Sequence, residues 1–125
     1  MGRNIKTFSL SVSVRGREIS ALVILLEEGI HVSVFGGDKS HIGAVCVIDP
    51  EGICHRMQFP GHRDGVIASG WAKALSAAGY GPVTAEAGIH YNQIDPAGID
   101  EVMAASDHLL EQVLEMLNIP AGACF

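Results

Sequence analysis

The 125-residue sequence is poor in basic side chains, with eight Lys and Arg against 14 Asp and Glu. The formal net charge is −6, whereas proteins that bind nucleic acid need a basic face. No apolar run is as long as a membrane span, and the best candidate, 19–26, is short and ends at Glu27 and Glu28. The first six residues lack the apolar block of a signal peptide. The sequence therefore predicts a cytoplasmic protein that binds neither nucleic acid nor a membrane.

Cysteine is also scarce. Cys46, Cys54 and Cys124 are odd in number and irregular in spacing, and no Cys-x-x-Cys occurs, so they predict no disulfide framework. Cys46 lies in an apolar run and is interpreted as a small buried hydrophobic residue, and Cys54 flanks a turn. A hydrophobic content of 48% with 18% charged residues excludes a disordered chain. The length predicts a single domain over residues 1–125.

Strand-like alternation dominates the first half of the chain. In the first segment Phe8, Leu10 and Val12 alternate with serines, which is typical of a half-buried strand. We expect the order βββββαβα, with strands over 5–14, 18–26, 30–35, 42–48, 53–59 and 82–89 and helices over 65–78 and 96–117. The first five strands are expected to form an antiparallel meander. The predicted fold is an α+β two-layer sandwich, with a mainly antiparallel six-stranded sheet and both helices on one face.

Both predicted helices carry end signals. Asp64 and Asp95 stand where N-caps belong, Pro96 follows as the first helical residue, and Gly79 stands where a C′ glycine belongs. We therefore interpret both aspartates as helix caps rather than as site carboxylates. The long apolar stripe of the last helix is as compatible with a homodimer as with a monomer that buries the stripe on its own sheet.

The segment 36–44 holds more chemistry than a connector between two strands needs. Gly36 and Gly37 can adopt positive φ and turn backbone N–H groups toward one point. Lys39 and Ser40 could hold an anion there, and His41 could bind a metal or move a proton. The alternative is an ordinary glycine turn whose polar residues are only solvated.

Three of the six histidines share a context. His41, His62 and His90 each lie close to a glycine near the end of a predicted strand. Three imidazoles on converging loops can bind a divalent metal and leave a position open for a ligand. Asp38 and Glu86 could orient such a histidine. The alternative is three separate loop histidines that bond to backbone carbonyls.

Three segments, 36–45, 59–63 and 87–92, together resemble the small D-subunit family found with UbiD-type hydroxyarylic (phenolic) acid decarboxylases, described as prenylated-flavin chaperones. The resemblance covers most of the chain, although the Gly- and Ala-rich middle helix and the tail 121–125 depart from it. It implies a non-catalytic protein that binds reduced prenylated FMN and stores it or delivers it to the decarboxylase.

The resemblance also implies site residues. It assigns a divalent metal to His41, His62 and His90. It assigns the flavin nucleotide, prenylated FMN or FMN, to residues of the same segments: Gly36, Gly37, Asp38, Lys39, Ser40, His41, Arg63, Tyr91 and Asn92. Aromatic walls for the isoalloxazine ring could come from Phe35, Phe59, Trp71 and Tyr91, whose alternative role is core packing.

Two other functions stay open from the sequence. A three-histidine metal site with an open position could activate water in a small hydrolase or lyase, with Asp38 or Glu86 as the general base. Alternatively, the chain could be an accessory subunit that stabilises a decarboxylase by contact and binds nothing small.

Overall fold

The computed structural model describes residues 5–60 and 63–118. The predicted element order βββββαβα is confirmed. The elements are β1 (Lys6–Val14), β2 (Arg17–Leu26), β3 (Gly29–Gly37), β4 (Ala44–Ile48), β5 (Cys54–Gln58), α1 (Gly65–Ala77), β6 (Val83–His90) and α2 (Pro96–Leu117).

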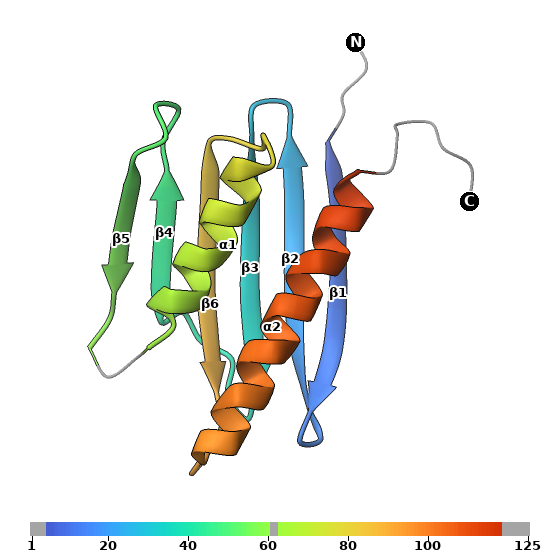
Figure 1. Ribbon diagram of the computed structural model, residues 1–125, viewed down its shortest axis with the longest axis vertical. Helices are drawn as coiled ribbons and strands as arrows, with labels where there is room; N and C mark the ends of the chain where they lie inside the picture. The colour runs from blue at the N-terminus through green and yellow to red at the C-terminus, as the bar shows by residue number, and fades with distance from the viewer. Residues whose placement is uncertain (1–4, 61–62, 119–125) are drawn as a thin grey trace.

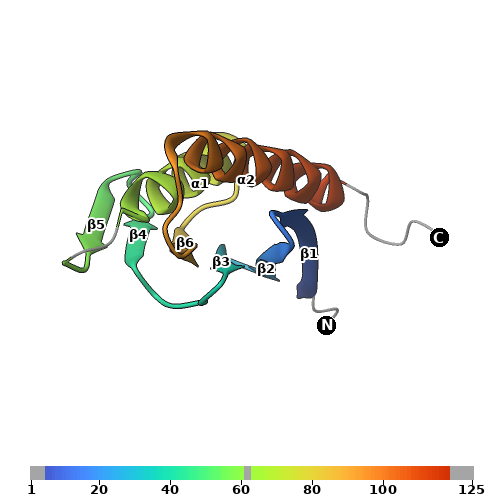
Figure 2. The same cartoon turned by 90° about the horizontal axis from the view of Figure 1, so that it is seen from below.

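The molecule has two layers, with both helices on the same face of the sheet (Figure 2). Helix α1 packs on β4 and β6, and the longer α2 crosses β1 and β2 (Figure 1). The predicted two-layer α+β architecture is therefore confirmed. Within residues 5–60 and 63–118, no helix is long and apolar enough to cross a bilayer.

The strand order is β1-β2-β3-β6-β4-β5, so the predicted five-stranded meander is wrong. Strand β6 lies between β3 and β4, parallel to β3 and antiparallel to β4. The other pairs, β1 with β2, β2 with β3 and β4 with β5, are antiparallel. The alternation of apolar and polar residues within a strand does not indicate which strands pair. The last strand, β6, follows α1 in the chain and enters the middle of the sheet.

The core lies between the sheet and the helices. Alternate residues of the strands face the helices, as the period-two pattern predicts. The indole N–H of Trp71 on α1 donates to the hydroxyl of Ser106 on α2 over 2.9 Å, which ties the two helices together inside the core. The largest fully buried side chains are Trp71, Ile19, Leu75, Leu109, Val23, Val32, Val34, Val83, Val113 and Cys46.

Two of the predicted helix ends are confirmed. Asp95 caps α2, because its side chain accepts the backbone N–H of Gly98 over 2.7 Å. Gly79 follows α1 with φ +95°. The N–H of Gly79 bonds to the carbonyl of Ser76, and the N–H of Tyr80 bonds to that of Leu75. These two hydrogen bonds together form the Schellman motif, in which glycine supplies the residue with left-handed backbone angles.

Candidate functional site

Two of the three segments that carry the resemblance, 36–45 and 87–92, meet at one end of the sheet, and we call the loops in these segments the motif loops. Because β3 and β6 are parallel and Gly37 pairs with His90, the loops that follow these two strands leave the sheet together. The backbone N–H groups of Asp38 and Lys39 both point at the carbonyl of His90, over 2.7 and 3.3 Å. These two amides therefore hold the two loops together and point at a protein carbonyl.

Glycines allow the chain to cross itself here. A side chain at Gly88 would overlap the carbonyl of His41, and one at Gly43 would overlap the carboxylate of Asp64. The loop 38–43 therefore passes directly over β6, and its end is fixed where Gly43 N–H donates to Ala87 over 2.9 Å. This crossing brings the His41 imidazole to the first residue before α1.

Asp64 is buried and connects three elements. Its Oδ2 lies 3.1 Å from Nε2 of His41, and its Oδ1 accepts the N–H of Ile89 over 3.1 Å. Asp64 stands at the N-cap position of α1, as predicted, but the prediction that its side chain caps the helix is wrong, because that side chain makes no cap hydrogen bond. The carboxylate is drawn to the imidazole instead, and the Gly65 N–H is satisfied by Oε1 of Gln58 over 3.0 Å. Because a carboxylate only accepts, Nε2 of His41 is the donor in this contact.

A second and more exposed network of hydrogen bonds holds His90. Nε2 of His90 lies 3.0 Å from Oδ1 of Asn92, and the Asn92 N–H donates to Asp38 over 2.9 Å. The other carboxylate oxygen of Asp38 accepts from Nε of Arg17 over 2.9 Å. The Asn92 N–H, and then the Arg17 guanidinium, hold the pKa of the Asp38 carboxyl below its usual value. An ionised Asp38 thus ties the loop after β3 to the loop after β6.

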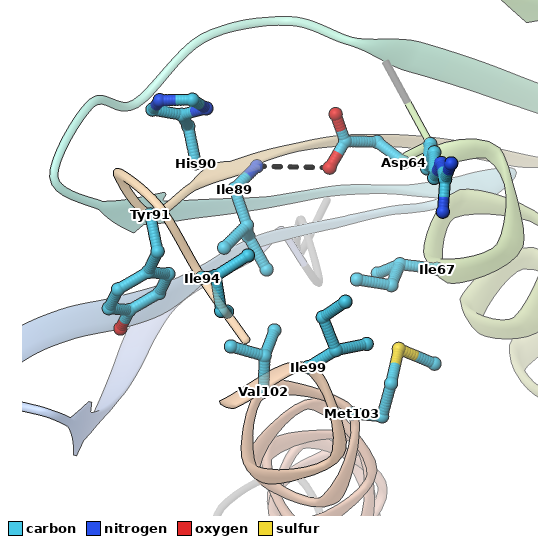
Figure 3. A pocket seen from close by; sticks show the side chains of 10 residues that line it. Asp64, Ile67, Ile89, His90, Tyr91, Ile94, Ile99, Val102 and Met103 are labelled. Carbon is cyan, nitrogen blue, oxygen red and sulfur yellow. Dashed lines mark hydrogen bonds between the residues drawn. The ribbon is translucent and has the colours of Figure 1, made fainter. Parts of the chain in front are cut away.

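A cavity of about 370 Å³ opens beside these networks, between the first turns of the two helices (Figure 3). Ile89 points into it, whereas the ring of His90 points to the opposite side of β6 (Figure 3). The residues that line it come from the segment before α1, from α1, from the end of β6 and the loop after it, and from α2: Arg63, Asp64, Ile67, Ile89, His90, Tyr91, Ile94, Ile99, Val102 and Met103. The walls are mostly apolar, and charged groups lie at one side only, which is typical of small-molecule sites.

The four aromatic residues predicted as walls for the isoalloxazine ring lie in different parts of the structure. Tyr91 lines the cavity, and its hydroxyl donates to the carbonyl of Val14 over 2.9 Å. Burial raises the pKa of this phenol. Trp71 lies in the core, while Phe59 is exposed beside β5. Phe35 lies on β3 between the inward-facing Val34 and Gly36. Of the four, only Tyr91 is placed on the cavity wall.

A family model described as the prenylated flavin chaperone LpdD-like domain matches residues 13–118. The chain belongs to this family. It is 29% identical over 108 residues to Protein LpdD of Lactiplantibacillus plantarum, which covers 82% of this chain and 79% of that protein. The fold also resembles a chain in a crystal structure of a novel chaperone complex for yeast 20S proteasome assembly. That match has a TM-score of 0.53 and 17% identity, and it covers 90% of this chain and 94% of the other.

The structure places most residues that the prenylated-flavin-chaperone resemblance selects at the same end of the sheet. Arg63 lies at the cavity beside Asp64, and Lys39 and Ser40 are exposed on the loop 38–43. Glu86 lies four residues before His90 on β6, paired in register with Ser33. These placements leave the individual binding roles as predictions.

Two of the three histidines of the predicted metal cluster, His41 and His90, lie in the described part of the chain. The rings of His41 and His90 approach edge to face, with centroids 6.4 Å apart, and His62 lies outside the described residues. In the part of the chain that the structure describes, no three His, Cys, Asp or Glu side chains form a group that could hold a metal ion. The described residues alone therefore do not fit a metal centre.

Sequence reasoning missed the apolar walls of the cavity. One signal was present, because Ile94 and Ile99 stand just before and four residues after the cap Asp95. This spacing is that of a hydrophobic staple. Both residues line the cavity. No sequence signal links them to Ile67 and Ile89, which come from other elements.

Proposed function

We propose that this chain binds prenylated FMN, with the ring system in the cavity between α1 and α2, and passes the cofactor to a UbiD-type decarboxylase. The observation that carries the proposal is the apolar cavity of about 370 Å³ next to the family's motif loops. This volume lies at the low end of the range of about 300–1,000 Å³ that is typical of small-ligand sites. The cavity suits a prenylated ring system, with the ribityl phosphate extending outside it.

The polar side of the cavity supports the orientation. Arg63 at the rim and Lys39 on the neighbouring loop supply positive charge for a phosphate. The carboxylate of Asp64 is already engaged by His41 and Ile89, which lessens its repulsion of an anion. The phosphate therefore belongs at the Arg63 side, and the rings belong against Ile99, Val102 and Met103.

A divalent metal on His41, His62 and His90 remains a prediction from the sequence. The described residues do not form such a centre, and no part of the binding geometry above depends on it. Native mass spectra of the purified protein will report a retained metal directly. A metal together with turnover of a substrate would instead favour the small metal enzyme.

The test of the cavity is anaerobic titration of the protein with reduced prenylated FMN, followed by native mass spectrometry. Met103→Trp fills the cavity wall and should weaken binding at least about tenfold. Met57→Trp is the matched control, because Met57 is exposed on β5 and does not line the cavity. Circular dichroism verifies that both variants fold. Equal affinity of Met103→Trp and wild type would overturn the proposed location.

Transfer to the decarboxylase is tested separately. A UbiD-type apo-decarboxylase should regain activity faster from cofactor-loaded protein than from the same concentration of free cofactor. The Met103→Trp protein, mixed with the same amount of cofactor, should give no acceleration. If loaded wild-type protein slows activation instead, the chain stores the cofactor without delivering it.

A further inference from the structure

The hairpin of β4 and β5 brings two cysteines together that are eight residues apart in the sequence. Its turn is tied by Asp49, whose Oδ1 accepts the N–H groups of Glu51 and Ile53 over 3.0 and 2.9 Å. The register pairs Ile48 with Cys54, two positions from Cys46, so both cysteines are on the same face of the hairpin. Their Sγ atoms are 2.9 Å apart.

This separation is within reach of a covalent bond. A disulfide has an S–S length of about 2.05 Å, so the two sulfurs need to approach by less than about 1 Å. The hairpin already fixes the two strands side by side, and β5 is an edge strand with only one neighbour. The approach therefore needs only a local adjustment of β5.

The two thiols differ in access. Cys54 is exposed, whereas Cys46 is completely buried under α1. Burial, and then the contact with Cys54, raise the pKa of the Cys46 thiol to about 11, while Ser69 and Lys73 of α1 act in the opposite direction. A dissolved oxidant therefore meets Cys54 first, and Cys46 lies directly behind it.

We propose that Cys46 and Cys54 form a redox-active pair that hydrogen peroxide oxidises to an intramolecular disulfide. In the first step Cys54 Sγ attacks one peroxide oxygen, the O–O bond breaks, and a sulfenic acid and one water form. Cys46 Sγ then attacks Cys54 Sγ and displaces the hydroxyl, which leaves as a second water with the Cys46 proton. Both sulfurs together lose two electrons, and peroxide gains them.

The pair connects to the candidate site through the two strands. β4 begins directly after the loop that carries His41, and β5 ends at Gln58, which holds the Gly65 N–H beside Asp64. A disulfide would join these two strands covalently on the side of the sheet that α1 covers. This proposal rests on the cysteine geometry alone and does not depend on flavin binding.

The test uses the full chain with Cys124→Ser, so that only the pair remains. After a small molar excess of hydrogen peroxide, the protein is denatured, alkylated and weighed by intact mass spectrometry. We expect a species about 2 Da lighter that takes up no alkylating reagent, stays monomeric on a non-reducing gel, and regains both thiols with dithiothreitol.

Two single-cysteine proteins are the controls. With Cys54→Ser added, the buried Cys46 should stay reduced at the same peroxide dose. With Cys46→Ser added instead, Cys54 should gain one oxygen and react with dimedone. The first control changes only an exposed residue, so it stays informative even if the second fails to fold. Two thiols that remain free, oxygen uptake without the loss of hydrogen, or disulfide-linked dimers in the two-cysteine protein would each overturn the proposal.

Discussion

The two helices begin with the same residue type in the same position, yet the two aspartates have different roles. Asp95 has an extended backbone (φ −91°, ψ 170°), and its side chain bonds to the Gly98 N–H in the first turn of α2. Asp64 already has helical angles (φ −71°, ψ −8°), and its side chain turns away from α1. It binds His41 and the Ile89 N–H, while Gln58 satisfies Gly65 at the start of α1.

Burial explains the difference. The Asp95 side chain is 58% exposed and has Arg15 beside it, so it can stabilise its own helix and remain hydrated. The Asp64 side chain is only 7% exposed, and a buried carboxylate must find strong donors. The donors nearest to it come from the loop over β6 and from β6 itself. The same cap signal thus produces a local contact at α2 and a contact that joins three segments at α1.

The largest effect that should separate the two positions is on stability. Asp64→Ala removes the acceptor for the partly buried N–H of Ile89 and for the His41 imidazole, so we expect the free energy of unfolding to fall by about 3 kcal/mol. Urea denaturation followed by circular dichroism measures this change. Asp64→Asn, which keeps one acceptor oxygen for Ile89, should lose less than Asp64→Ala. If Asp64→Ala is as stable as wild type, the carboxylate does not hold the site together.

The comparison also shows what local sequence could predict. Alternating residues such as Phe8, Leu10 and Val12 gave the strands, and Asp95 with Pro96 gave the start of α2, because these signals act between near neighbours. The parallel pairing of Gly37 with His90 was not predictable in this way, since it depends on where β6 enters the sheet. The motif loops could be selected by resemblance, but not their contacts.

The cavity was beyond sequence reasoning for the same reason. Its walls combine Ile67, Ile89, Ile94 and Met103, and each of these separately has the pattern of an ordinary core residue. The role of the Asp64 side chain was misassigned because an aspartate that caps a helix and a buried aspartate that bonds to distant segments stand at the same place in the sequence, just before a helix. Only the tertiary position beside His41 distinguishes the two roles.

At α2 the corresponding change should be smaller. Asp95→Ala removes an exposed cap, and we expect the Tm to fall by about 4 °C. Asp95→Asn is the matched control, because asparagine is an equally good N-cap and should keep the Tm close to that of wild type. Thermal unfolding by circular dichroism compares the three proteins. A Tm for Asp95→Asn as low as that of Asp95→Ala would mean that charge, rather than the cap bond to Gly98, sets the stability at this end.

The smallest effect is the pH dependence of the Asp95 charge. The Gly98 N–H, and with it Arg15, lower the pKa of the Asp95 carboxyl in the folded protein. The unfolded chain then binds more protons between the two pKa values, so this stabilisation is present above the unfolded pKa of about 3.9 and is lost as the pH falls through the folded pKa. Asp95→Asn has no such group. The small Tm advantage of wild type over Asp95→Asn should therefore shrink between about pH 5 and about pH 2. A constant difference over this range would show that the ionised carboxylate adds nothing to the cap.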